Sequence, residues 1–90
     1  MVKEKKAPVS EILGTISDIY ELILFNDNVN DFTFVIETLI QVCELEPIQA
    51  EQITLIVHEK GKCGVISGSV EELRPMYEKL SNKGLTVSIE

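Results

Sequence analysis

Three adjacent side chains carry oxygen atoms that can accept hydrogen bonds or hold positive charge: Asn26, Asp27 and Asn28. They come directly after an apolar run that ends at Phe25. Asn and Asp bond their own backbone and favour turns and helix starts, so the triplet could serve the fold alone. It could also capture a cation, because a protonated amino group needs several convergent acceptors of which at least one is anionic.

The one histidine, His58, could complete such a set of acceptors. A neutral imidazole nitrogen accepts a hydrogen bond, and His58 follows the apolar Val57 in a predicted helix. If that helix packs against the end of the strand before Asn26, polar acceptors and an apolar pocket wall lie side by side. This arrangement would suit a protonated α-amino group attached to an apolar residue.

The same segment also resembles a calcium-binding loop, since Asn26, Asn28, Asn30 and Glu37 match four of its ligand positions. An EF-hand, however, starts its loop with Asp, has Gly at the sixth position and has a helix before it. Here those places hold Asn26, Asp31 and strand-forming residues. We therefore predict no metal and no other cofactor.

Catalysis would need an activated nucleophile, and the sequence offers none. Cys43 falls on the apolar face of a predicted helix, and Cys63 lies in a predicted strand beside Gly64. Neither position is typical of an activated thiol. The chain also lacks a nucleophile elbow, a phosphate loop and a metal motif. We predict that it is not an enzyme and has no catalytic residues.

The composition of the chain limits the kinds of partner that we expect it to bind. The chain of 90 residues is one domain by length, and its net charge of −7 argues against nucleic acid. No Lys or Arg occurs between Lys6 and Lys60, and this acidic stretch would attract a cation or a basic partner. No apolar run is long enough to span a membrane, and no apolar segment follows the basic N-terminus as in a secretory signal. We expect a cytoplasmic protein.

The candidate residues must be positioned by the predicted secondary structure. Residues 19–25 are rich in β-branched and aromatic side chains, which predicts a short strand. Apolar residues at three- and four-residue steps predict a helix over residues 32–43, with Asn30 or Asp31 as its N-cap. Pro47 is well placed to begin a second helix, and Gly61 can end it.

The second half of the chain repeats this alternation. Residues 63–67 predict a strand, and the capping-box pattern of residues 69–72 opens a third helix. Pro75 inside that helix predicts a bend or a 3₁₀-like first turn. Residues 85–89 alternate as a last strand. The order β-α-α-β-α-β indicates a small α+β domain over residues 18–90, preceded by a flexible extension over residues 1–17 with at most a helical turn near residues 9–16.

Several short motifs in this order resemble the ClpS family, the adaptors of the ATP-dependent Clp protease. The motifs are Phe25-Asn26-Asp27, Phe34-Val35, Gln49-Ala50, Val57-His58, Gly61-Lys62 and Cys63-Gly64-Val65. The resemblance implies a three-stranded antiparallel sheet packed against three helices, a fold similar to that of a ribosomal stalk C-terminal domain. It also implies an adaptor that binds destabilising N-terminal residues (Leu, Phe, Tyr or Trp) and hands the substrate to a Clp AAA+ unfoldase.

The resemblance also assigns roles to particular residues. The α-amino group of the substrate would be held by Asn26, Asp27, Asn28 and His58. The pocket for the first side chain would be lined by Phe32, Val35, Thr54 and Val57. Arg74 would contribute to docking on the unfoldase. The partners implied are the N-terminal domain of the unfoldase and substrate proteins, with no nucleic acid and no membrane, and nothing requires more than a monomer.

This sequence departs from the family pattern in ways that bear on specificity. Asn28 stands where a second Asp is usual, residues 29–31 replace an aromatic-Thr-Pro sequence, and Ser69 replaces an acidic docking residue. Phe32 and Thr54 replace two Met residues of the pocket, and Thr54 should leave the pocket larger and slightly polar. The alternative function is a protein-interaction domain on the same fold that does not recognise N-termini.

Overall fold

The computed structural model describes residues 18–90, so the predictions made for residues 1–17 lie outside the described residues. The secondary structure comprises β1 (Tyr20–Phe25), α1 (Phe32–Cys43), α2 (Pro47–Lys60), β2 (Lys62–Gly68), α3 (Val70–Asn82) and β3 (Thr86–Ile89). This is the β-α-α-β-α-β order that the sequence predicts. The predicted α+β class and three-stranded antiparallel sheet are confirmed.

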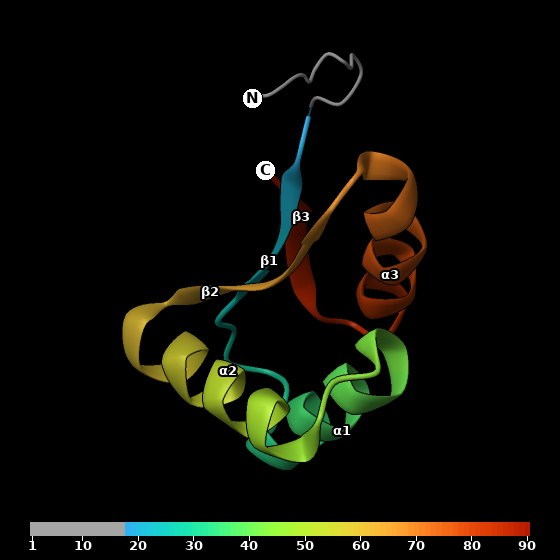
Figure 1. The fold of residues 1–90 in the computed structure, drawn as a ribbon. Coiled ribbons are helices and arrows are strands. Elements are labelled where there is room, and N and C mark those ends of the chain that lie inside the picture. Colours follow the sequence, from blue (N-terminus) through green and yellow to red (C-terminus); the bar gives the residue numbers. More distant parts are fainter. Residues whose placement is uncertain (1–17) are drawn as a thin grey trace.

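The sheet places β1 between the two strands that follow it much later in the chain (Figure 1). Both pairings of β1 are antiparallel. The register with β2 shifts after Leu22, which pairs with Ile66, because Ile23 pairs with Gly64 and Val65 is left as an extra residue. Such a bulge increases the local bend and twist of the strand.

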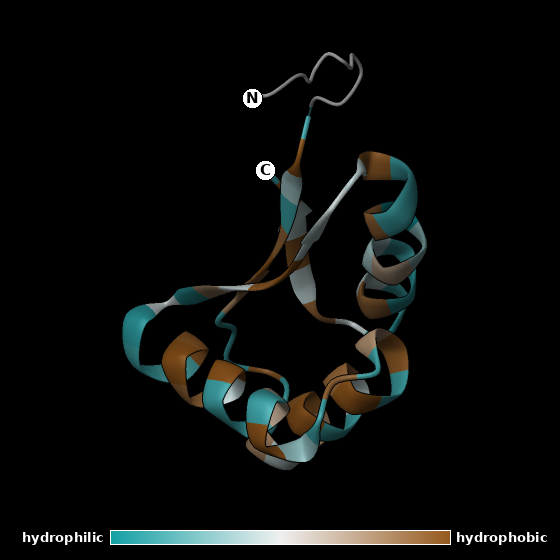
Figure 2. Cartoon of the chain, in the orientation of Figure 1, coloured by the Kyte–Doolittle hydropathy of each residue, from teal (hydrophilic) through white to brown (hydrophobic). Residues whose placement is uncertain are grey.

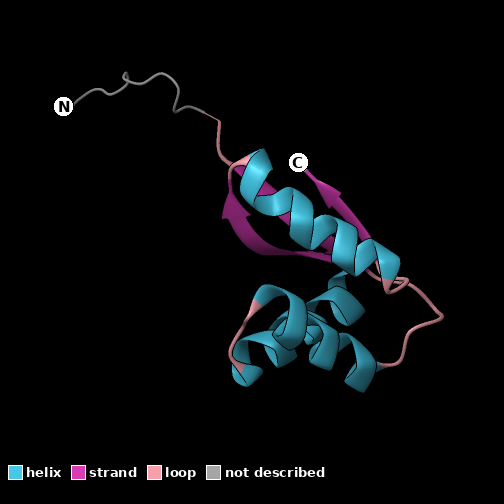
Figure 3. Cartoon of the chain, turned by 90° about the vertical axis from the view of Figure 1, so that its right-hand side faces the viewer, coloured by secondary structure: helices cyan, strands magenta, loops and turns pink. Residues whose placement is uncertain are grey.

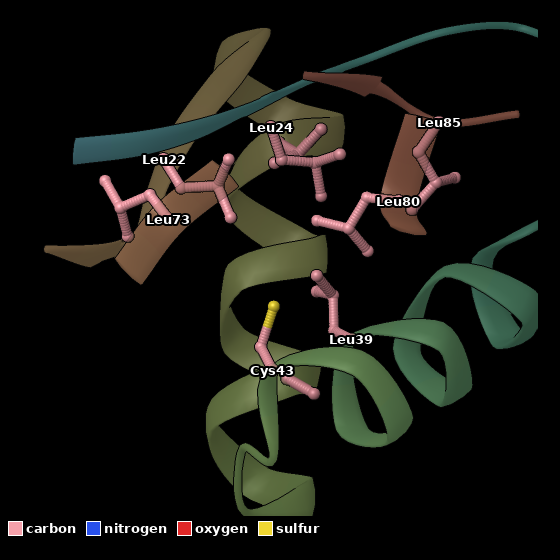
Figure 4. Packing of buried hydrophobic residues seen from close by; sticks show 9 residues of the cluster. Leu22, Leu24, Leu39, Cys43, Leu73, Leu80 and Leu85 are labelled. Carbon is pink, nitrogen blue, oxygen red and sulfur yellow. The ribbon is translucent and has the colours of Figure 1, made fainter. Parts of the chain in front are cut away.

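The helices form two groups around this sheet. Helix α3 lies along the sheet, whereas α1 and α2 pack together beyond the end of β1 (Figures 1 and 3). The largest fully buried side chains come from both groups and point toward one another (Figure 4). They are Leu22, Leu24, Leu39, Leu73 and Leu80. One hydrophobic core therefore ties the sheet to all three helices, since Ala50 and Val57 of α2 belong to the same cluster.

The predicted helix ends are present. Asp31 is the N-cap of α1, and its side chain accepts a hydrogen bond from the Phe34 amide at 2.8 Å. Helix α2 begins at Pro47 and ends before Gly61, whose φ of 98° is the left-handed conformation that glycine adopts without strain. Ser69 and Glu72 form the capping box of α3.

For Pro75 the sequence predicts a bend or a 3₁₀-like first turn, and the second alternative is wrong. Helix α3 is an α-helix from Val70 through Pro75 to Asn82, and it has no 3₁₀-like first turn. A proline removes one backbone donor and crowds the carbonyl four residues earlier. Here the donor lost belongs to the second turn, while the capping box satisfies the first turn. The cap and the buried Leu73 and Leu80 keep the helix continuous.

Helix α2 carries apolar side chains on more than one face. Ala50, Thr54 and Val57 are buried against the rest of the domain. Ile48 on the opposite side is 61% exposed, and apolar and polar segments alternate along the helix in Figure 2. The buried face is the one that matters for the site, because its last residues lie at the end of β1.

Candidate functional site

A pocket of about 320 Å³ opens where β1, the loop after it and the end of α2 meet. It is lined by Leu24, Phe25, Asn26, Asp27, Asn28, Asn30, Phe32, Val35, Thr54, Val57, His58 and Leu85. All eight residues that the sequence analysis assigned to the α-amino site and the hydrophobic pocket are in this lining. Arg74 is not; it is an exposed residue of α3.

A backbone hydrogen bond brings the two halves of the site together. The Asn26 amide donates to the Gly61 carbonyl at 2.9 Å, and the Gly61 amide donates to the Val57 carbonyl at 2.9 Å. The end of β1 is thereby joined to the C-terminus of α2, whose last turn contains His58. Both Asn26 and His58 are exposed at this junction, so their polar atoms are accessible to a ligand.

Asp27 organises the loop that forms one side of the pocket mouth. Its Oδ1 accepts hydrogen bonds from the amides of Val29 and Asn30, both at 2.9 Å, and its Oδ2 accepts one from Asn30 Nδ2 at 3.0 Å. The structural interpretation of the Asn-Asp-Asn triplet therefore holds for Asp27. The Asp27 carboxylate can still accept a further hydrogen bond, because a carboxylate has about four acceptor sites and the loop uses three of them.

These hydrogen bonds also govern the charge of Asp27. Burial raises the pKa of the carboxyl group, but the bonds from Asn30 and Val29 outweigh it, and the pKa lies below its ordinary value of 3.8. The side chain is therefore ionised at neutral pH. The pocket mouth thus has one fixed negative charge beside the neutral side chains of Asn26 and Asn28.

The inner wall of the pocket is apolar. Leu24, Val57 and Leu85 are buried, while Phe32 at the mouth is 40% exposed. Thr54 is also buried, and its hydroxyl donates to the Ala50 carbonyl at 2.7 Å. The hydroxyl hydrogen is used within α2, so Thr54 adds less polarity to the pocket than its residue type suggests.

The sequence analysis missed four residues of the lining: Leu24, Phe25, Asn30 and Leu85. Leu24 and Phe25 directly precede Asn26, and their place at the end of a strand was a usable signal. Asn30 was considered only as a helix cap or a calcium ligand, yet its Nδ2 donates to the Gly84 carbonyl at 3.0 Å and ties the loop to the turn after α3. No local pattern linked Leu85 to the site.

The two cysteines do not provide a nucleophile. Burial raises the pKa of the Cys43 thiol to about 11. The pKa of Cys63 is also raised, by burial and by the charge of Glu21. Both thiols are therefore protonated at neutral pH, and a thiol in that form is a poor nucleophile.

Residues 18–90 contain neither a candidate metal site nor a candidate membrane-spanning helix. No group of three or more His, Cys, Asp or Glu side chains there is arranged to hold a metal ion. Within the same residues, no helix has the length and apolar character needed to cross a membrane.

Comparison with known proteins finds relatives that are adapter proteins of the Clp protease. The chain is 36% identical over 59 residues to the ATP-dependent Clp protease adapter protein ClpS of Hydrogenovibrio crunogenus, covering 63% of this chain and 57% of the relative. It is 39% identical over 57 residues to the protein of that name from Nitratidesulfovibrio vulgaris, again covering 57% of the relative. The chain is 39% identical over 72 residues to the protein of that name from Synechococcus sp., and this match covers 79% of this chain and 69% of the relative. The match thus spans little more than half the length of the first two relatives.

A solved structure shares the fold. The structure of Agrobacterium tumefaciens ClpS2 bound to L-phenylalaninamide superimposes with a TM-score of 0.71 and covers 80% of this chain and 94% of that one, at 18% identity. The family model of the ATP-dependent Clp protease adaptor protein ClpS matches residues 16–88, which is most of the chain. The chain therefore belongs to the ClpS family of Clp protease adaptor proteins.

Proposed function

We propose that this protein binds the N-terminal residue of substrate proteins and delivers them to a Clp AAA+ unfoldase for degradation. The observation that carries the proposal is one pocket with hydrogen-bond acceptors and a negative charge at its mouth and an apolar interior. A free N-terminus with a bulky apolar side chain matches both parts. A domain that only docks other proteins has no need for this combination.

The α-amino group is the polar half of the ligand. It offers three N–H donors and one positive charge. Asn26 Oδ1 and a nitrogen of His58 accept two of these bonds, directly or through water. Asp27 supplies the opposing charge, and its Oδ2 has capacity for a further bond because it accepts only one in the free protein. Asn28 also lines the pocket, is exposed, and adds a further acceptor.

The first side chain is the apolar half. Transfer of a Leu or Phe side chain from water into an apolar pocket is worth about 1.5–3 kcal/mol. Val35, Thr54 and Val57 line the pocket that receives this side chain. Agrobacterium tumefaciens ClpS2, which shares the fold, binds L-phenylalaninamide, and this supports an aromatic first residue as a probe here.

The rest of the proposal concerns delivery. The partner is the N-terminal domain of the unfoldase, and Arg74 on the exposed side of α3 contributes to docking. Ser69 serves as the N-cap of α3, so it contributes to helix stability whether or not it docks. We propose a cytoplasmic monomer that needs no cofactor.

Acetylation of the ligand tests the proposal. A short peptide that starts with Phe is expected to bind, whereas the same peptide with an acetylated N-terminus should bind at least about tenfold more weakly, because loss of a charge-assisted hydrogen bond costs about 1.5–3 kcal/mol. Fluorescence anisotropy with a C-terminal label measures both affinities. A peptide that starts with Ala is the control for the apolar half. Equal binding of free and acetylated peptides would reject recognition of the N-terminus.

Binding should depend on pH in a defined direction. An α-amino group has a pKa of about 7.7–8.0, so affinity should fall as pH rises above that value. An imidazole nitrogen accepts a hydrogen bond only when the ring is neutral, so acidification that protonates the ring should also weaken binding. Asp27 stays ionised over this range because its pKa is lowered. Anisotropy titrations from pH 5.5 to 9 should show an optimum, and tighter binding at pH 5.5 than at pH 7 would argue against His58 as an acceptor.

Thr54 is expected to set the size of the pocket. Thr54→Met adds length to a buried side chain of the lining, so it should weaken binding of a peptide starting with Trp about tenfold relative to one starting with Leu. Thr54→Val keeps the shape and removes only the hydroxyl that donates to Ala50, and it should preserve the order of affinities. If Thr54→Met weakened both peptides equally, Thr54 would not discriminate between them.

A further inference from the structure

We infer that Val29 and Phe32 form an apolar rim on the pocket that contacts the second residue of the bound peptide and favours an apolar side chain there. This inference rests on the proposed function, because it concerns the same ligand. It adds a preference at a second position of the substrate, beyond the N-terminal residue.

Val29 is the most exposed large apolar side chain of the described residues, at 90%. Burial in the fold therefore gives no reason for an apolar residue at this position. Its backbone is nevertheless fixed, since the Val29 amide donates to Asp27 Oδ1 at 2.9 Å and the next residue, Asn30, is bonded to both Asp27 and Gly84. The Val29 side chain is thus exposed to solvent on a loop whose backbone is fixed by hydrogen bonds.

This side chain lies next to the pocket in the sequence and in the fold. Asn28 and Asn30, on either side of Val29, both line the pocket. Phe32 lines it as well and remains 40% exposed. Two exposed apolar residues therefore adjoin the mouth: Phe32, the first residue of α1, is in the pocket lining, and Val29 lies in the chain between two residues of that lining.

The path of a bound peptide follows from the geometry of its first residue. The Cα of that residue has three heavy-atom substituents, which are the amino group, the side chain and the carbonyl. If the amino group is held by Asn26 and His58 and the side chain enters the pocket, the carbonyl must leave over the remaining part of the mouth. Asp27 and Asn28 are assigned to the amino group, so the exit that remains lies beyond Asn28, beside Val29 and Phe32, and the second side chain passes over this rim.

Two peptides that differ only at the second position provide the test. Phe-Leu-Ala and Phe-Asn-Ala sequences with a C-terminal label compare side chains of similar size, and anisotropy measures both. We expect the wild-type protein to prefer Leu about four- to fifteenfold, as one or two buried methylene groups would give. Val29→Thr keeps the shape of the side chain and should reduce this preference. Ile48→Thr, at a 61% exposed position of α2 outside the pocket lining, is the matched control and should keep it.

The outcomes separate this inference from the proposed function. A preference for Leu that is lost in Val29→Thr and kept in Ile48→Thr would support the rim. Equal binding of the two peptides by the wild-type protein, or an unchanged preference in Val29→Thr, would overturn the rim and leave N-terminal recognition intact. If neither peptide bound more tightly than its acetylated form, the proposed function and the rim would both be wrong.

Discussion

An Asp27→Asn variant is expected to bind a peptide with a free N-terminal Phe about ten- to a hundredfold more weakly than the wild-type protein. The reason is the loss of the one fixed negative charge among the residues that line the pocket, since interactions with a charged partner are worth about 1.5–3 kcal/mol. Asn retains an oxygen that can accept from the amides of Val29 and Asn30, so the loop keeps much of its support. Fluorescence anisotropy at pH 7 measures the loss.

Asp31→Asn is the control for this experiment. It removes the same charge from the same loop, but Asp31 is the N-cap of α1 and is outside the pocket lining. Asn is as good an N-cap as Asp, so affinity should change less than about threefold, as expected for a screened surface charge. A loss in Asp31→Asn as large as that in Asp27→Asn would mean that general charge, rather than Asp27, attracts the ligand.

The stability that Asp27 contributes to the wild-type protein should depend on pH. The folded-state pKa of Asp27 is lowered, so its ionised form adds stability at pH values above the ordinary value of 3.8 and this contribution is lost as pH falls below it. The difference in unfolding free energy between wild type and Asp27→Asn should therefore shrink on acidification. Urea denaturation at pH 7 and pH 3 would show this, and a difference that grows at pH 3 would contradict it.

A Leu24→Ala variant is expected to lose about 2–5 kcal/mol of unfolding free energy, the range for truncating a buried leucine. Leu24 is 1% exposed in the central strand and belongs to the core that joins the sheet to the helices (Figure 4). A small domain is stable by about 5–15 kcal/mol in total, so this loss is large. Urea denaturation followed by circular dichroism measures it.

Ile48→Ala is the matched control for stability. It also shortens a large aliphatic side chain, but Ile48 is 61% exposed on α2. We expect its unfolding free energy to stay within about 0.5 kcal/mol of the wild type. Because Leu24 also lines the pocket, Leu24→Ala should weaken peptide binding even where the protein remains folded. A cost below about 1 kcal/mol for Leu24→Ala would contradict its place in the core.

The function was predicted from the sequence only through its resemblance to a known family. The family was identified from motifs around Asn26, Val57 and Gly61, and the family model confirms it. The family is one of protease adaptors, in agreement with the prediction that the chain is not an enzyme. The roles of the individual site residues stay predictions, since they require binding experiments.

Local patterns determined the elements and their ends. Apolar residues at helical spacing predicted α1, and Asp31, Pro47, Gly61 and the Ser69 capping box marked helix ends that the structure confirms. These signals work because helix capping and turn formation depend on backbone groups within a few residues. Pro75 shows the limit of such reasoning, because a local penalty was outweighed by the cap and by the buried Leu73 and Leu80.

The pocket itself was decided by the tertiary structure. Asn30 reaches the Gly84 carbonyl and Leu85 closes the apolar wall, although both partners lie more than fifty residues further along the chain than the loop. The bond between the Asn26 amide and the Gly61 carbonyl likewise depends on how α2 packs against the sheet. The sequence by itself specified which residues could bind an N-terminus, because residue type fixes charge and hydrogen-bonding capacity. Long-range packing determined which of them share one cavity. Contacts between distant segments produce no recognisable local pattern in the sequence of either segment.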